Sequence, residues 1–323
     1  MGELLETRRE ETTKRIERIR RELKQAETLC SKRACVFATG SFGRGEASQH
    51  SDLDLFIAGE RPGLSRLNQI LVKADLIKVT CKLKLPPFSG DGAYLAHYTI
   101  DDLVKTLGKR EDDVTNTFTA RLLLILESRP LLEANLHRQI IREVIDAYWR
   151  DYHGHERDFT PGFLANDILR LWRTFCVNYE AGTSTEPERK RAKRRLRNYK
   201  LKHSRLLTCY SALLYLLAVY STRKTVTPSD ALHMTAITPT ERLEWLLQQR
   251  SFRSAHSGVN RLVRLYEQFL RNTNAAEETM IKRFMNATVR KRYTTEQYKF
   301  GDTLFRVLNE VGRGNRFHRL LVV

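Results

Sequence analysis

A Gly-Ser pair, followed ten residues later by two closely spaced aspartates, constrains this chain more than any other feature of its sequence. Residues 37–46 read Phe-Ala-Thr-Gly-Ser-Phe-Gly-Arg-Gly-Glu, and residues 51–57 read Ser-Asp-Leu-Asp-Leu-Phe-Ile. The apolar residues of the second stretch predict a short buried strand. Because side chains two positions apart on a strand point to the same face, we expect Asp52 and Asp54 to lie side by side.

Two neighbouring carboxylates indicate a cation site, since their negative charges repel each other unless a positive ion lies between them. Oxygen ligands suit Mg²⁺, which usually keeps part of its coordination shell for water and substrate phosphates. The turn at Gly40 and Ser41 offers backbone N–H groups and a hydroxyl to a phosphate. A lone Asp-X-Asp usually lies on a solvated edge or turn, so it is the combination with this turn that favours phosphoryl or nucleotidyl transfer.

This arrangement resembles the signature of the polymerase-β nucleotidyltransferase superfamily. In its longer form, Gly-Ser-Phe-Gly-Arg-Gly-Glu with Ser-Asp-Leu-Asp, it is similar to the catalytic segment of bacterial PII-protein uridylyltransferases and of related stand-alone nucleotidyltransferases (the DUF294-like group). The catalytic motif is the specific part of the likeness. Weaker similarity continues over most of the chain after residue 30, in the stretches 88–95, 118–131, 166–173 and 196–202.

The resemblance implies roles for the residues of the motif. Asp52 and Asp54 would hold two Mg²⁺ (or Mn²⁺) ions, one activating an acceptor hydroxyl and both stabilising the reacting phosphorus while pyrophosphate leaves. Ser41, with the backbone of Gly40, would contact the β and γ phosphates of a nucleoside triphosphate.

Two further charged residues of the motif, Arg44 and Glu46, are expected to assist at the same site. Arg44 would neutralise phosphate charge, because a guanidinium is always ionised and can form two parallel hydrogen bonds. Glu46 is expected to support Arg44 and not to bind metal.

The third carboxylate that the superfamily usually draws from a later strand has no obvious counterpart here. The strand expected over residues 94–98 carries His97 where an acid would lie, so we expect Asp91, in the glycine-flanked loop before it, to be the third catalytic acid. Glu127 is the alternative. Its position at the end of an apolar helix also favours a structural ion pair with Arg121 or Arg129.

Net charge points to anionic partners. The chain carries 56 basic and 38 acidic residues, a formal charge of +18, and such a field favours nucleic acid, nucleotides or acidic protein. Residues 189–205 contain ten basic residues and no acidic one. They indicate either a solvated helix surface or a basic wall that binds a triphosphate or a polynucleotide. We expect the nucleotide side of the site to include four cations of the helical region: Arg170, Arg173, Lys200 and Lys202.

Apolar periodicity predicts an α+β protein, in which a small mixed-sheet catalytic domain precedes a helical domain. The expected divisions are a charged helix over 1–30, a catalytic domain over 31–130 and a helical substrate-binding domain over 131–323. Strands are predicted at 34–38, 51–58, 77–85 and 94–98. Helices are predicted at 43–49, 64–76, 103–107, 117–126, 136–152, 162–179, 196–220, 239–249, 257–272 and 278–287.

The sequence has no run of eighteen apolar residues, and residues 1–30 lack the apolar core of a signal peptide. We therefore expect a cytoplasmic protein that does not contact membranes.

These features together predict a Mg²⁺-dependent nucleotidyltransferase that moves a nucleoside monophosphate to a hydroxyl and releases pyrophosphate. The basic charge favours RNA as the acceptor, such as a tRNA 3′ end modified by toxin-type enzymes. Three alternatives stay open: template-free synthesis of a short or cyclic oligonucleotide, as in bacterial defence; transfer to a protein side chain; and an inactive module that binds nucleic acid or a partner. A regulatory partner protein is compatible with each of them.

Overall fold

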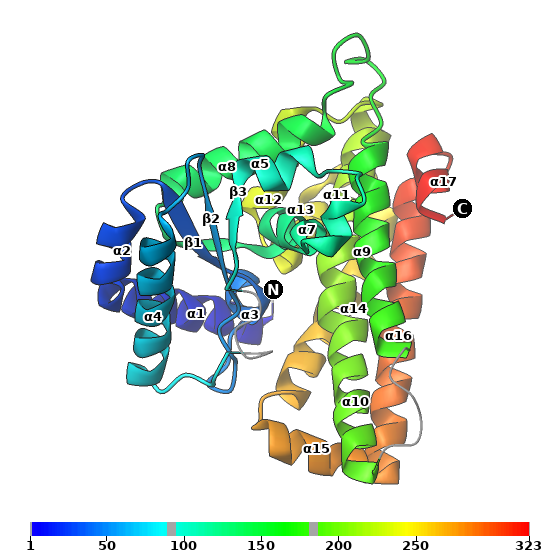
Figure 1. Cartoon of the computed structure of the whole chain (residues 1–323). Helices are drawn as coiled ribbons and strands as arrows, with labels where there is room; N and C mark the ends of the chain where they lie inside the picture. The colour runs from blue at the N-terminus through cyan, green and yellow to red at the C-terminus, as the bar shows by residue number, and fades with distance from the viewer. Residues whose placement is uncertain (1, 89–94, 181–186, 323) are drawn as a thin grey trace. The chain divides into compact units, whose positions relative to one another are not determined.

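The computed structural model describes residues 2–88, 95–180 and 187–322, which divide into two units (Figure 1). The sheet unit comprises Glu3–Asp151 together with Ala231–Thr238. The helical unit is formed mainly by Tyr152–Asp230 and Pro239–Val323. The sheet unit extends to Asp151, beyond the expected domain end at residue 130, because helix α8 (Ala134–Tyr148) packs on the sheet.

A four-stranded mixed sheet lies at the centre of the sheet unit, in the order β3-β2-β1-β4. Strand β1 pairs antiparallel with β2 and with β4, and β2 pairs parallel with β3. In the central pair, Phe37 lies opposite Phe56, and their rings stack with centroids 5.6 Å apart. The strand bounds are β1 Ala34–Ala38, β2 Leu55–Gly59, β3 His97–Thr99 and β4 Arg129–Leu132.

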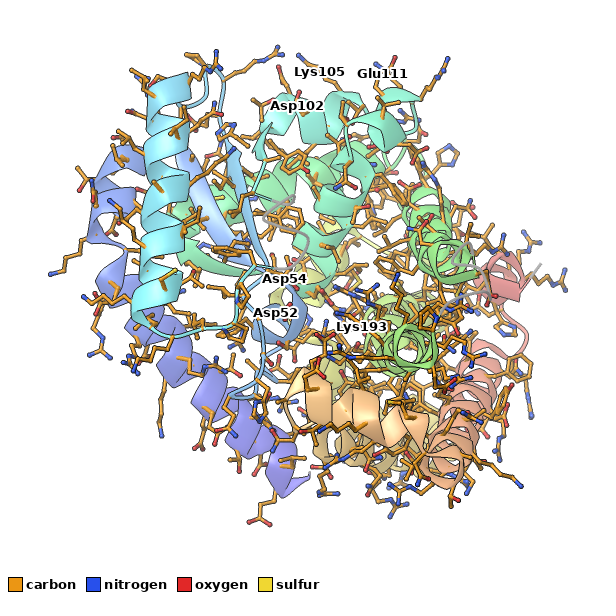
Figure 2. The ribbon with its side chains drawn as sticks, turned by 60° about the horizontal axis from the view of Figure 1, so that its bottom comes forward. Asp52, Asp54, Asp102, Lys105, Glu111 and Lys193 are labelled. Atoms are coloured by element: carbon orange, nitrogen blue, oxygen red, sulfur yellow. The ribbon has the colours of Figure 1, made fainter. Side chains whose placement is uncertain are left out.

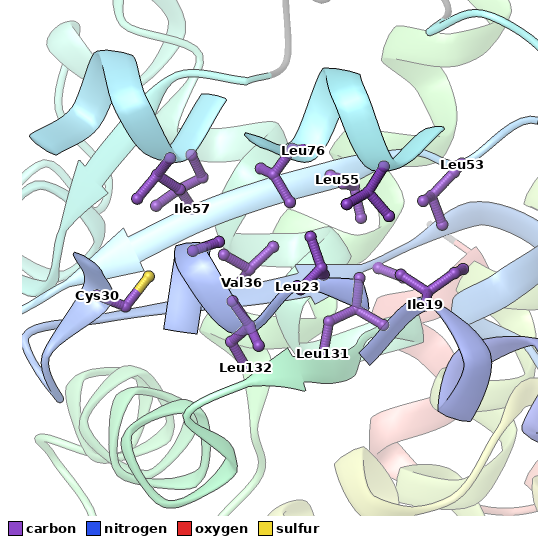
Figure 3. Close-up of a cluster of buried hydrophobic side chains, with 14 of the residues drawn as sticks. Ile19, Leu23, Cys30, Val36, Leu53, Leu55, Ile57, Leu76, Leu131 and Leu132 are labelled. Carbon is purple, nitrogen blue, oxygen red and sulfur yellow. The ribbon is translucent and has the colours of Figure 1, made fainter. Parts of the chain in front are cut away.

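Alternation along β1 and β2 gives the sheet two apolar faces. Val36, Leu55 and Ile57 point into a core that is closed by helices α1 (Glu3–Glu22), α2 (Lys24–Cys30) and α4 (Arg66–Lys82) (Figure 3). Phe37 points to the opposite face, where its ring lies 5.4 Å from that of His137 on α8. Burial on both faces explains why these strands are almost wholly apolar.

The remaining helices of the sheet unit are short, apart from α7. They are α3 Gly40–Gly43, α5 Ile100–Lys105, α6 Glu111–Val114 and α7 Thr117–Glu127. The start of α5 is fixed by a reciprocal cap, in which Thr99 accepts from the backbone of Asp102 and the Asp102 carboxylate accepts from the backbone of Thr99. The helix predicted over 103–107 therefore begins earlier, at Ile100, and ends at Lys105.

Several predicted boundaries in this unit are wrong. The strand predicted over 77–85 is the second half of α4, because Val72, Leu76 and Val79 follow helical spacing and all three are buried. The short helix predicted over 43–49 lies earlier, at α3. The single helix predicted over 1–30 is interrupted at Leu23, where the chain passes from α1 to α2.

The helical unit is built around α11 (Leu206–Arg223), whose residues from Leu206 to Tyr220 are almost all buried. A π-helical turn at Leu201–Arg205 joins it to the preceding helix, α10 (Glu188–Lys200), so the helix predicted over 196–220 covers the junction of two helices. The bounds are α9 Gly162–Glu180, α10 Glu188–Lys200, α13 Pro239–Gln248, α14 Arg253–Asn272, α15 Glu277–Met285, α16 Ala287–Gly312 and α17 Arg316–Val322. Helix α12 (Pro228–Ala236) begins in this unit, and its residues from Ala231 onward belong to the sheet unit. The helix predicted over 278–287 is α15, and two further helices, α16 and α17, follow it.

One continuous helical stretch of the described chain, Glu188–Arg223, is long and apolar enough to cross a membrane by length and composition alone. Of its most apolar window, 78% is buried inside the protein, as in the core helix of a folded domain. The stretch is therefore weak evidence for a membrane span.

Candidate functional site

Asp52 and Asp54 lie on the extended segment that leads into β2, just before the strand begins at Leu55. Backbone pairing continues into this segment, since the Thr39 N–H donates to the Asp54 carbonyl at 2.9 Å. Leu53 is buried, while the two aspartates are half-buried, so the alternation of a strand persists. Figure 2 shows the two aspartates next to each other beside the α3 turn.

A glycine is required at position 40 by both its backbone and its neighbour. Gly40 has a φ of +63°, and a Cβ added to it would lie 2.6 Å from an Asp54 carboxylate oxygen. Gly43 is confined from the other side, because a Cβ there would lie 1.8 Å from the carbonyl oxygen of Glu127. The glycine-rich turn therefore fits between the Asp54 carboxylate and the end of α7.

Arg44 lies beneath this turn in a buried cluster of charges. Its Nε donates to Glu46 at 2.6 Å, and another of its nitrogens donates to Glu127 at 2.9 Å. The other oxygen of Glu127 accepts from the Gly40 N–H at 3.0 Å. The three charged side chains are at most 8% exposed. One buried guanidinium thus connects the motif to α7 and fixes the backbone of the turn.

This cluster bears on two expectations. Arg44, expected to neutralise phosphate charge, is buried and paired with two carboxylates. Glu127 forms a structural ion pair as its alternative interpretation foresaw, but Arg44 is its partner, while Arg121 pairs with the buried Asp112. The support of Arg44 by Glu46 is as expected.

Helix α1 holds the loop that follows Arg44, a role that the sequence interpretation missed. Thr12 accepts from the Ala47 N–H at 2.9 Å, and Arg8 donates to the Ala47 carbonyl at 3.3 Å. The guanidinium of Arg15 lies 4.6 Å from the centre of the Phe42 ring. Positions 8, 12 and 15 follow the i, i+4, i+7 spacing of one helical face, which was the available signal.

The two half-buried aspartates fit a hard divalent cation. Both contribute carboxylate oxygens, and the buried hydroxyl of the adjacent Thr39 has no hydrogen-bond partner in the described part of the chain. The described residues contain no group of three or more His, Cys, Asp or Glu side chains able to hold a metal. A donor set of two carboxylates suits an ion that takes its remaining ligands from water and phosphates.

The expected third carboxylate, Asp91, lies outside the described residues. His97, at the start of β3, lies opposite Ile57 in the middle of β2, three positions after Asp54. Burial lowers the pKa of His97, and its Nε2 atom is buried without a hydrogen-bond partner among residues 2–88, 95–180 and 187–322.

The structure places the four predicted cations of the helical unit in two groups. Arg170 and Arg173 share a face of α9 and line a pocket of about 350 Å³ that α17 closes through Leu320. Lys200 is exposed at the end of α10, and Lys202 lies over the ring of Trp172 at 5.1 Å. These two lysines do not line that pocket.

Comparison with known proteins gives one match. Residues 16–130 match the family model described as a nucleotidyltransferase domain, which supports the polymerase-β-type superfamily. The matched segment spans the whole sheet except the last residues of β4, and it contains both aspartates and the glycine-rich turn. Such domains generally use divalent metal ions and nucleoside triphosphates. No curated protein and no solved structure matches the chain.

Proposed function

We propose that the nucleotidyltransferase domain of this chain moves a nucleoside monophosphate from a nucleoside triphosphate to a hydroxyl, with Asp52 and Asp54 as the ligands of Mg²⁺. The observation that carries the proposal is the close approach of the Asp54 carboxylate to the turn at Gly40, where an added Cβ would lie 2.6 Å from a carboxylate oxygen. The length and residue order of the motif favour placing the chain near the PII-uridylyltransferase-like branch of the nucleotidyltransferase superfamily.

Each residue of the motif has a part in this proposal. When bound, the divalent cation supplies positive charge to the triphosphate and to the acceptor oxygen. Ser41, which is half-buried at the surface of the turn, donates its hydroxyl to a phosphate oxygen. Arg44 and Glu127 keep the Gly40 backbone in place through the contacts described above. They act as positioning residues and do not contact the nucleotide.

The reaction is an in-line displacement at the α phosphorus. The acceptor oxygen forms a bond to phosphorus as the bond to the bridging oxygen of pyrophosphate breaks, and the hydroxyl proton passes to solvent or to a carboxylate. The products are the nucleotidylated acceptor and pyrophosphate. No water enters the balance, so hydrolysis of the triphosphate is a side reaction.

RNA is the acceptor that the charge of the chain supports best. The net charge of +18 and the ten basic residues between 189 and 205 suit a polyanion, and Lys200 and Lys202 belong to that segment. Base preference depends on side chains that contact the nucleobase, so the labelling experiment below includes every common nucleotide.

The test is nucleotide transfer by the purified chain with Mg²⁺ or Mn²⁺. Each α-labelled ribo- and deoxynucleoside triphosphate is supplied with and without total RNA and cell extract. An Asp52→Asn/Asp54→Asn variant is compared with wild type and with Asp151→Asn/Asp158→Asn, which removes the same charge from exposed positions. We expect pyrophosphate release from wild type and the control, and loss of at least about a thousandfold in the Asp52/Asp54 variant.

The location of the label identifies the acceptor. Label in RNA supports the proposal in full. Label in protein or in a small soluble product keeps nucleotidyl transfer but replaces RNA by a protein side chain or a nucleotide. Equal signals from wild type and the Asp52/Asp54 variant under every condition would reject the proposal in favour of a binding module.

A further inference from the structure

A groove of about 470 Å³ runs between α9 and α10 within the helical unit. Phe175, Asn178 and Tyr179 form its α9 side, while the α10 side is strongly basic. The cations on that side are Lys190, Lys193, Arg194 and Arg197. Positions 190, 194 and 197 follow the spacing of one helical face, so the charges form a row along the groove.

Aromatic rings line the same side of α9 and are accompanied by cations. Trp172, Phe175 and Tyr179 lie at i, i+3 and i+7, and all three are half-buried, so part of each remains exposed. A cation lies over each ring, at distances between 5.1 and 5.6 Å from the ring centre. The pairs are Lys202 with Trp172, Arg205 with Phe175 and Arg194 with Tyr179.

The acids of the helical unit pair with other cations of α10. Arg189 pairs with Glu278, and Arg191 and Arg195 pair with Glu188. Lys190 and Arg197 have no carboxylate partner in the part of the chain that the structure describes.

Like charges at this spacing destabilise a helix. An anion bound along the row would relieve that repulsion, so the helix itself favours an anionic ligand. Lys193, at the edge of the groove, already has a carboxylate 3.2 Å away on Glu277.

We infer that the groove between α9 and α10 binds single-stranded nucleic acid. Its phosphates would follow the row of Lys190, Arg194 and Arg197, and one or more bases would stack on the exposed ring surfaces of α9. Cations beside ring faces are the arrangement by which proteins bind single strands without sequence preference. An acidic peptide would use the charges but not the rings, and a duplex hides its base faces.

The length of the basic surface suits a nucleic-acid strand better than a single nucleotide. From Lys190 to Arg205 the chain advances 15 residues, which is about 22 Å along a helix and matches several phosphates. The inference rests on the proposed function in one respect, since it names the class of acceptor, but binding can be measured without any transfer. Ribose and deoxyribose strands share the chemistry that the groove recognises, and the experiment separates them.

The binding experiment uses the full chain in the Asp52→Asn/Asp54→Asn background, so that no product forms. Fluorescence anisotropy follows a labelled single-stranded 12-mer of RNA, the same sequence as DNA, and a 12-base-pair RNA duplex. The groove variant Lys190→Gln/Arg194→Gln/Arg197→Gln is compared with Arg189→Gln/Arg191→Gln/Arg195→Gln. This matched control removes the same charge from other positions of the same helix, none of which lines the groove.

The inference expects single strands to bind more tightly than the duplex, and the groove variant to bind them at least about tenfold more weakly than the control. The slope of log K against log salt should also become less negative by about 2 in the groove variant, because three phosphate contacts at about 0.7 each are lost. Stronger binding of the RNA strand than of the DNA strand would assign the groove to RNA. Equal binding of the two strands would assign the groove to single-stranded nucleic acid of either kind.

Stacking is tested at Tyr179. Tyr179→Ala should weaken binding of the single strand by about fivefold or more, whereas Tyr179→Phe keeps the ring and should bind as wild type. Thermal melts of each variant show whether the helical unit remains folded. Tyr179 is half-buried, so its replacement is expected to leave the fold intact.

The outcomes separate this inference from the proposed function. Equal losses in the groove variant and the control, equal affinity for duplex and single strand, or no nucleic-acid binding would overturn the inference. If the wild-type chain then still labels a protein or a small molecule, nucleotidyl transfer stands without the groove. Groove-dependent binding with no pyrophosphate release would support the inference and reject the proposed function.

Discussion

Gly40 shows how much of the site depends on single atoms. The residue combines a left-handed backbone with a carboxylate oxygen placed where a methyl group would lie. The sequence motif contains this glycine and predicts a turn at its position. The contact with Asp54 follows only from the fold, because it needs the antiparallel pairing that brings Thr39 against Asp54.

We predict that Gly40→Ala displaces the Asp54 carboxylate and lowers the rate of pyrophosphate release at least about tenfold, with a loss of about 1–2 kcal/mol in the free energy of unfolding. Gly154→Ala is the matched control, because Gly154 also has a positive φ, of +87°, but nothing lies within 4 Å of an added Cβ. Steady-state kinetics and urea denaturation measure the two effects. Equal kinetic losses in the two variants would contradict the role of the clash.

The buried cluster around Arg44 makes a second prediction. Arg44→Gln leaves two buried carboxylates without their cation, so the free energy of unfolding should fall by about 3–5 kcal/mol. Arg150→Gln, at a side chain 63% exposed, should change it by less than about 0.5 kcal/mol. Urea denaturation compares the two. An unchanged stability with a raised KM for the nucleotide would return Arg44 to the phosphate-binding role predicted from the sequence.

The cluster also marks a limit of sequence interpretation. Arg44 and Glu127 are 83 positions apart, and no local pattern connects them. The motif identified Gly40, Ser41, Asp52 and Asp54 as a set, because backbone geometry within a short segment holds them together. Ionic partners brought together by tertiary folding could not be found in the same way.

Among the helices and strands, α4 gives the clearest lesson. Its second half contains Ile77, Val79 and Cys81 in alternation, which favoured a strand. In the structure Val79 is buried and Ile77 is 47% exposed, because the core contacts a helical face formed with Val72 and Leu76. A short apolar run fits both the two-residue period of a strand and the 3.6-residue period of a helix. Only packing against α2 and the sheet decides between the two.

The two faces of α4 should therefore respond differently to mutation. Leu76→Ala opens a cavity in the core and should lower the free energy of unfolding by about 2–5 kcal/mol. Leu67→Ala, at a side chain 72% exposed on the same helix, should change it by less than about 0.5 kcal/mol. Urea denaturation of both variants tests the orientation of the helix. A large loss at Leu67 would show that the assigned faces are wrong.

At the scale of the whole molecule, each unit contains a buried histidine that is neutral. Burial lowers the pKa of His137 in the sheet unit and of His203 in the helical unit to about 4. His203 packs parallel to Phe269 at 4.7 Å and its Nδ1 contacts the Tyr199 carbonyl at 2.9 Å. Burial disfavours the imidazolium at both histidines, and at His203 it outweighs the hydrogen bond to the Tyr199 carbonyl, which favours the charged form.

We predict that acid weakens both units. An unfolded histidine has a pKa near 6.5, so the unfolded state binds more protons between pH 6.5 and 4, and the stability present above pH 6.5 is lost as the pH falls toward 4. The free energy of opening, from hydrogen exchange in α11 and α8, should drop by about 2 kcal/mol per histidine between pH 7 and pH 5. His203→Phe should remove this pH dependence in α11 and leave it in α8. If the free energy of opening in α11 still fell with pH in the His203→Phe variant as it does in wild type, the acid sensitivity would belong to other groups.

The architecture of the whole chain was largely predictable from the sequence, but the boundaries of several of its parts were not. Alternating and helical patterns are averages over many residues, so the α+β organisation is confirmed and the central strand β1 has the predicted bounds. The sheet unit extends past the predicted end because Phe37 needs the cover that α8 provides through His137. Helices α16 and α17 were missed because charged residues interrupt their apolar spacing.

The short segment Ala231–Thr238 has a consequence for how this protein is made. It belongs to the sheet unit, although the chain on both sides of it belongs to the helical unit. A ribosome reaches this segment 80 residues after Asp151, roughly 4 to 16 s later at 5–20 residues per second. Until then the nascent sheet unit lacks one of its parts. Completion of the unit that carries Asp52 and Asp54 therefore follows synthesis of α9, α10 and α11.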